Sequence, residues 1–105
     1  MALVNRLAGI GDLETSPKLS VGAFWAHLYE LANGFRTQAQ IISYFNLDAA
    51  EQTELTWLIG RYNAKPNATA KAKFIELINV IFYLAEAKVD GYTTNAAIVA
   101  RINAI

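Results

Sequence analysis

Apolar residues recur along this chain at intervals of three and four positions, the spacing that places them on one face of a helix. No segment shows sustained alternation of apolar and polar residues, which would indicate a half-buried strand. The pattern predicts helices over about 21–33, 38–45, 49–63, 68–88 and 95–105. We therefore expect an all-α fold, a bundle of about five helices.

The most apolar stretch, residues 74–87 (FIELINVIFYLAEA), is predicted to be the central helix of this bundle. Apart from Glu76 and Asn79, its first ten residues are apolar, so the helix would be apolar over most of its circumference. A membrane span is the competing interpretation. The run is shorter than the roughly 20 apolar residues that a bilayer requires, and Lys71 and Lys73 precede it. We therefore expect no membrane-spanning segment.

Capping signals mark the predicted helix boundaries. Each helix follows a residue whose side chain can accept a hydrogen bond from the first turn: Ser20, Thr37, Asp48, Asn67 and Thr94. Gln40 and Glu51 stand three positions after two of these residues, which is the capping-box spacing. Gly34 supplies the left-handed residue that ends the first long helix.

The first sixteen residues differ from the rest because two glycines, Gly9 and Gly11, interrupt their helical spacing. Residues 1–16 are predicted to form a short helix or a docked arm, and residues 17–105 a single helical domain. At 105 residues, the chain is long enough to bury a core without disulfides or metals.

Residues 34–47 and 91–104 match at five of fourteen positions and share the pattern G-[FY]-x-T-x-A-x-I. Each position has a structural reason: the glycine closes the preceding helix, the aromatic residue covers the turn, the threonine caps the next helix, and the isoleucine begins its buried face. The match predicts two related helix-turn-helix units, at about 20–47 and 68–105, with a linking helix at about 49–63. Independent convergence on a favourable helix connection is the alternative explanation.

The composition favours a partner protein over nucleic acid. Nine basic and nine acidic residues cancel, so no overall field attracts nucleic acid or an anionic membrane. Hydrophobic residues make up 54% of the chain and charged residues 17%, which is more apolar than an average soluble domain. Part of this apolar surface is expected to be covered by another protein or by further copies of the chain.

Residue types that carry catalysis or bind metals are scarce. The chain has no cysteine and one histidine, His27, for which we expect a hydrogen-bonded or solvent-edge structural role. Glu51 and Glu54 share a helix face but fit a solvated first turn that complements the helix dipole. Without a phosphate-binding loop or a nucleophile motif, we expect no catalytic, metal-binding or cofactor-binding residues and no enzymatic activity.

Two groups of residues are candidates for contact with a partner. Aromatic side chains dominate protein interfaces, so four are predicted as anchors, although each could belong to the core instead: Trp25, Tyr29, Trp57 and Tyr62. One basic cluster could contact phosphates or an acidic protein surface, or form an ordinary solvated surface: Arg61, Lys65, Lys71 and Lys73.

A DNA-binding regulator is the alternative function. Residues 41–48 have the apolar spacing of a DNA-binding helix-turn-helix, which would make residues 49–61 the recognition helix. Glu51, Gln52 and Glu54 occupy positions expected to be exposed on that helix, and acidic side chains there would repel phosphates. Nucleic acid is therefore not the expected partner.

The segments QIISYFNLDAAEQTELTWLI (40–59) and GYTTNAAIV (91–99) resemble small all-helical proteins of tailed bacteriophages. The resemblance spans residues 34–104 and implies a connector, decoration or tail-associated subunit. Such a subunit would be made in the host cytoplasm. A secretory signal is not expected, because Asn5, Arg6 and two glycines interrupt the apolar residues at the N-terminus. It would enter the virion and dock in multiple copies on capsid, neck or tail proteins or on itself.

Overall fold

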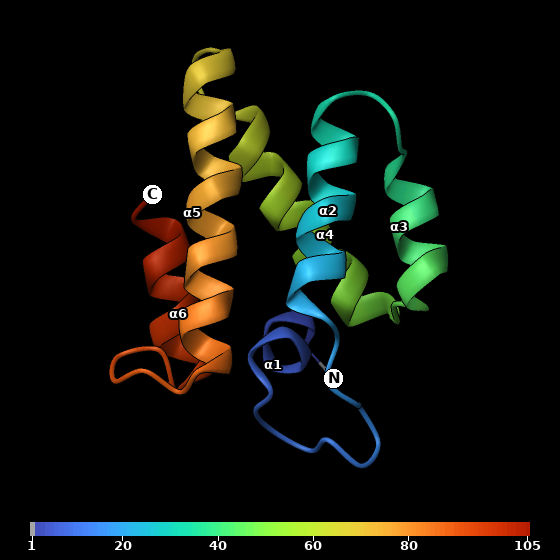
Figure 1. Cartoon of the computed structure of the whole chain (residues 1–105). Helices are drawn as coiled ribbons and strands as arrows, with labels where there is room; N and C mark the ends of the chain where they lie inside the picture. Colours follow the sequence, from blue (N-terminus) through green and yellow to red (C-terminus); the bar gives the residue numbers. More distant parts are fainter. Residues whose placement is uncertain (1) are drawn as a thin grey trace.

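A computed structural model describes residues 2–105 of the chain and contains six helices and no strands in that range (Figure 1). They are α1 (Leu3–Ala8), α2 (Val21–Ala32), α3 (Gln38–Phe45), α4 (Ala49–Asn63), α5 (Ala68–Glu86) and α6 (Asn95–Asn103). The predicted all-α fold is confirmed. In addition to the five expected helices, the N-terminal segment, predicted to be a short helix or an arm, contains the short helix α1. No helix in this range combines the length and the apolarity that a membrane span needs.

The helices begin where the capping residues are. The side chains of all five predicted caps accept a hydrogen bond from the amide three residues later, at 2.8 to 3.2 Å: Ser20, Thr37, Asp48, Asn67 and Thr94. Gln40 and Glu51 complete the two capping boxes by accepting from the cap amides. The position at which each of these helices begins therefore follows from local hydrogen bonding and does not depend on tertiary packing.

The two repeated segments agree at the start of their second helix but differ before it. Gly34 takes φ +78° one residue after the C-cap of α2, Asn33, as expected for a residue that closes a helix. In the second unit Lys88 takes the left-handed conformation (φ +57°), and Gly91 lies in a separate turn. The expectation that both glycines close the preceding helix is therefore wrong for Gly91.

The aromatic residues of the repeat also differ. Tyr92 is half-buried, and the Arg101 guanidinium lies 4.0 Å from the centre of its ring. Phe35, the matching residue, leaves 81% of its surface exposed. The prediction that this aromatic residue covers the turn is wrong for Phe35, whereas Tyr92 packs against the hydrophobic cluster.

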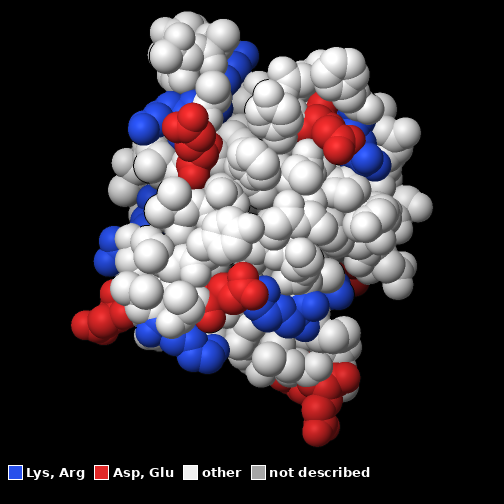
Figure 2. Space-filling model, viewed as in Figure 1, with Lys and Arg blue, Asp and Glu red and all other residues white. Residues whose placement is uncertain are grey.

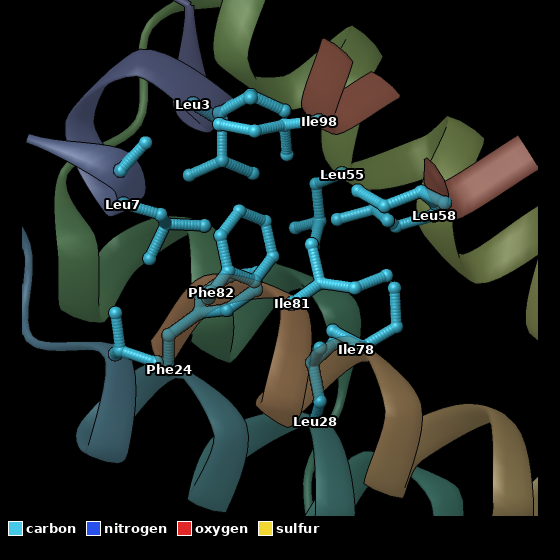
Figure 3. Close-up of a cluster of buried hydrophobic side chains, with 14 of the residues drawn as sticks. Leu3, Leu7, Phe24, Leu28, Leu55, Leu58, Ile78, Ile81, Phe82 and Ile98 are labelled. Atoms are coloured by element: carbon cyan, nitrogen blue, oxygen red, sulfur yellow. The ribbon is translucent and has the colours of Figure 1, made fainter. Parts of the chain in front are cut away.

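Helix α5 is the centre of the bundle, as its apolar run predicted. It packs against α1, α2, α4 and α6, whereas α3 lies outside α2 (Figure 1). Side chains of these helices converge on one hydrophobic cluster (Figure 3). The ring of Phe82 on α5 stands edge-on to Phe24 on α2 at 6.3 Å between centroids, and Phe24 meets Phe45 on α3 at 5.7 Å.

Helix α1 belongs to this core. Its four apolar side chains are fully buried: Leu3, Val4, Leu7 and Ala8. The helix contacts α4, α5 and α6, and is joined to α2 by a mostly exposed connection over residues 9–20. The N-terminal segment is therefore part of the hydrophobic core and not an arm on its surface.

Candidate protein-docking groove

An open groove of about 480 Å³ lies where the C-terminal half of α2 meets the end of α4 and the first half of α5. Figure 2 shows the surface between the upper ends of α5 and α2 as uncharged, with charged side chains on both sides. We call this feature the docking groove. Its lining residues are Trp25, Tyr29, Ala32, Asn33, Tyr62, Ala68, Lys71, Ala72, Ile75 and Glu76.

Two aromatic residues of α2 form one wall. Trp25 and Tyr29 stand four positions apart, so they share a helix face, and their rings stack at 5.7 Å between centroids. The Trp25 indole Nε1 donates a hydrogen bond to the Ile75 carbonyl at 3.1 Å, which ties α2 to α5. Tyr29 leaves 53% of its surface exposed. The Trp25 ring is therefore fixed in place, and the Tyr29 ring leaves half of its surface open to solvent.

The opposite side carries Tyr62 of α4 and Lys71 of α5. The Lys71 ammonium lies 5.6 Å from the centre of the Tyr62 ring, a cation–π arrangement. At the rim, Glu76 is 3.8 Å from Lys73, and both side chains are 66% exposed. Because an ion pair so exposed contributes little, Glu76 is available to a second partner. The groove thus has apolar walls and charges of both signs along its edge.

The structure brings three of the four predicted anchors together. Trp25, Tyr29 and Tyr62 line one groove, whereas Trp57 packs against the hydrophobic cluster and does not line it. Two small residues in the sequence are consistent with a groove at this position. Ala68 and Ala72 stand one helical turn apart and leave space that longer side chains would fill.

The predicted basic cluster is divided among different contacts. Arg61 donates to the Asn103 carbonyl at 2.8 Å, and Lys65 donates to the Ile105 carbonyl. Arg61 therefore stabilises the C-terminal end of α6, where carbonyl groups lack helical partners, and Lys65 holds the segment that follows it. Lys71 lines the groove, and Lys73 is exposed beside Glu76.

The first turn of α4 is covered by α1, so the expectation that Glu51 and Glu54 are solvated is wrong. Glu51 is 3% exposed, and its Oε2 lies 2.8 Å from Arg6 Nη1. Glu54 is partly buried and accepts a hydrogen bond from the Val4 amide at 3.3 Å. Both carboxylates hold the N-terminal helix. Pattern analysis missed this because the partners are 45 and 50 residues apart in the chain.

The Glu54 carboxyl is expected to give stability a distinctive pH dependence. Burial raises its pKa above the ordinary value of 4.5, against the lowering effect of the Val4 and Leu3 amides. Just above pH 4.5 the folded protein keeps a proton that the unfolded chain has lost, so the free energy of unfolding falls as pH rises through this window. Hydrogen bonds lower the pKa of Asp12 and Asp48 below 3.8, so their contribution is lost only at lower pH.

Glu54→Gln is expected to abolish this decline, because the amide retains an oxygen for Val4 but does not titrate. Urea unfolding of both proteins in buffers from pH 4.5 to about 7 measures the difference. Parallel profiles for the two proteins would contradict the assignment.

His27 has a structural role. Its Nδ1 lies 2.7 Å from the Ala23 carbonyl and therefore donates to it, and the ring packs on Tyr44 at 4.2 Å and Phe45 at 5.0 Å. The residue is 7% exposed, so it is not at a solvent edge. Residues 2–105 contain no group of three or more histidine, cysteine, aspartate or glutamate side chains placed to hold a metal ion.

The docking groove therefore combines aromatic walls with charges of both signs along its edge. In comparisons with protein-family models, curated proteins and solved structures, none matches this chain.

Proposed function

We propose that this protein is a non-enzymatic docking subunit that binds other proteins through the docking groove. The observation that carries the proposal is the convergence of Trp25, Tyr29 and Tyr62 on one open surface. Aromatic residues clustered at the centre of a concave surface are the usual source of binding energy in protein interfaces. Lys71 adds a cation that is already oriented by the Tyr62 ring.

The partners that we propose are components of a tailed-bacteriophage virion. The basis is the resemblance of residues 40–59 and 91–99 to small helical phage proteins that assemble in many copies. A subunit of this kind needs an exposed apolar surface that a neighbouring protein covers. The docking groove meets that need.

Tyr29→Ala is expected to weaken capture of the partner at least about tenfold, equivalent to ~1.4 kcal/mol, because it removes an exposed ring from the groove wall. The measurement is pull-down of purified capsid, neck and tail products encoded by the neighbouring genes, followed by titration calorimetry. The proposal also requires that the neighbouring genes encode such products.

Tyr83→Ala is the matched control. Tyr83 is 50% exposed, against 53% for Tyr29, and lies on α5 outside the groove. Equal losses for the two variants would indicate a general surface effect. Full binding by Tyr29→Ala would mean that the groove is not the docking site.

The contacts of α4 support docking over DNA recognition. Arg61 and Lys65, the cations nearest the end of that helix, are bound to carbonyl groups at the end of α6, and Glu51 is buried against Arg6. A DNA-binding regulator would be retained on duplex DNA with an affinity that falls steeply with salt. Such retention, lost on charge reversal of Arg61 and Lys65, would overturn the docking proposal. Lys73→Glu provides a milder reversal, because Lys73 does not hold α6.

A further inference from the structure

Phe35 is the most exposed large apolar side chain among the described residues, at 81%. It stands in the turn between α2 and α3, and its amide donates to the Glu30 carbonyl at 2.9 Å. The next residue, Arg36, forms an ion pair with Glu30 at 2.7 Å. The backbone on both sides of the ring is therefore held in place. A side chain so exposed buries little apolar area within the chain, so it contributes little to folding.

Phe35 lies next to the docking groove. Asn33 lines the groove and is two residues earlier, so the two Cα atoms are at most about 7 Å apart. An exposed ring and a recess are therefore close neighbours along the chain at the end of α2. A two-fold symmetric interface brings the same patch of both copies together, so a contact between a ring and a recess would be made twice.

We propose that two copies of the chain associate about a two-fold axis, with Phe35 of each copy in the docking groove of the other. The inference rests on the proposed docking function and names a second copy as an occupant of the groove. A cavity of about 150 Å³ holds a benzene ring, so a groove of about 480 Å³ has room for the Phe35 side chain. The ring would contact Trp25 and Tyr29.

The charges at the groove favour a second copy over a peptide of one sign. Within residues 2–105, Lys71 has no carboxylate within 4.0 Å, and Glu76 has only its loose contact with Lys73. An acidic peptide would meet Glu76, and a basic peptide would meet Lys71. A second copy presents both signs, so Lys71 faces Glu76 of the partner subunit and the reverse contact forms by symmetry.

Sedimentation equilibrium of the full chain over a concentration series tests the association. The wild-type protein is expected to show a monomer–dimer equilibrium, and Phe35→Asp to raise its dissociation constant at least about 100-fold, because two ring insertions are lost per dimer. Leu13→Asp is the control, since Leu13 is 40% exposed and lies outside the groove. A wild-type protein that stays monomeric, or a Phe35→Asp dimer of wild-type affinity, would overturn the proposal.

Mixing two variants separates a lost contact from a misfolded chain. Phe35→Asp keeps its groove and Tyr29→Asp keeps its ring, so the mixture should form a heterodimer with one intact insertion, tighter than either variant alone. No preference for the heterodimer would overturn the proposal. If the wild-type protein does not dimerise but Tyr29→Ala still loses binding to a virion partner, the second-copy inference fails and the docking function stands. If the wild-type protein does not dimerise and Tyr29→Ala binds the virion partner as the wild type does, both the second-copy inference and the docking function are refuted.

Discussion

Phe82→Ala is expected to lower the free energy of unfolding by about 3–5 kcal/mol, the usual range for a buried phenylalanine. Phe82 is 1% exposed and lies on α5, the helix that contacts four others. Its truncation would leave a cavity in the cluster shown in Figure 3, beside the edge-on Phe24 ring. Urea unfolding measures the change, and the midpoint of thermal unfolding should fall by at least roughly 10 °C.

The adjacent residue provides the control. Tyr83 is also aromatic and on α5, but it is 50% exposed, so Tyr83→Ala should change the free energy of unfolding by no more than about 1 kcal/mol. Helix propensity changes by a similar amount in the two substitutions, so the difference between their unfolding free energies reports the effect of burial. Similar losses at both positions would contradict the central placement of α5.

Features determined by neighbouring residues could be predicted from the sequence. The five capping residues and the two capping boxes lie where spacing placed them, because each depends on a side chain and an amide three positions away. The buried face of α5 followed from its apolar run in the same way. Ile41 and Ile98, which begin the buried faces of α3 and α6, are both fully buried.

Features that depend on tertiary contact were not predictable from the same pattern. Glu51 looked like an exposed first-turn carboxylate because nothing within its helix shows that α1 covers it. Arg61 and Lys65 looked like a basic patch because their partners, the carbonyl group of Asn103 in α6 and that of Ile105 beyond it, are 42 and 40 residues away.

The docking groove falls between these cases. Helical spacing alone pairs Trp25 with Tyr29, but the crossing of α4 and α5 decides that Tyr62 and Lys71 join them. The exposure of Phe35 also needed the structure, since the same position in the second repeat is occupied by a half-buried tyrosine. The sequence therefore predicted several binding residues without predicting their common surface.

Glu51→Gln is expected to destabilise the fold by about 3 kcal/mol, because it leaves the Arg6 guanidinium without its counter-charge. The Arg6 side chain is 12% exposed, and its other hydrogen bond is to the Pro17 carbonyl at 3.0 Å. The substitution removes the ion pair without removing the capping box. A glutamine at position 51 retains an oxygen that accepts from the Asp48 amide, so the capping box survives while the ion pair is lost.

A double-mutant cycle with Arg6→Met isolates the pair. Methionine replaces the aliphatic part of Arg6 without a charge, so Arg6→Met/Glu51→Gln should be more stable than the sum of the single losses requires, by about 1–3 kcal/mol. Urea unfolding of the four proteins at neutral pH gives the coupling free energy, and a pair this buried should resist added salt. If the losses are additive and each is below about 1 kcal/mol, the contact behaves as an exposed ion pair and adds little to the attachment of α1.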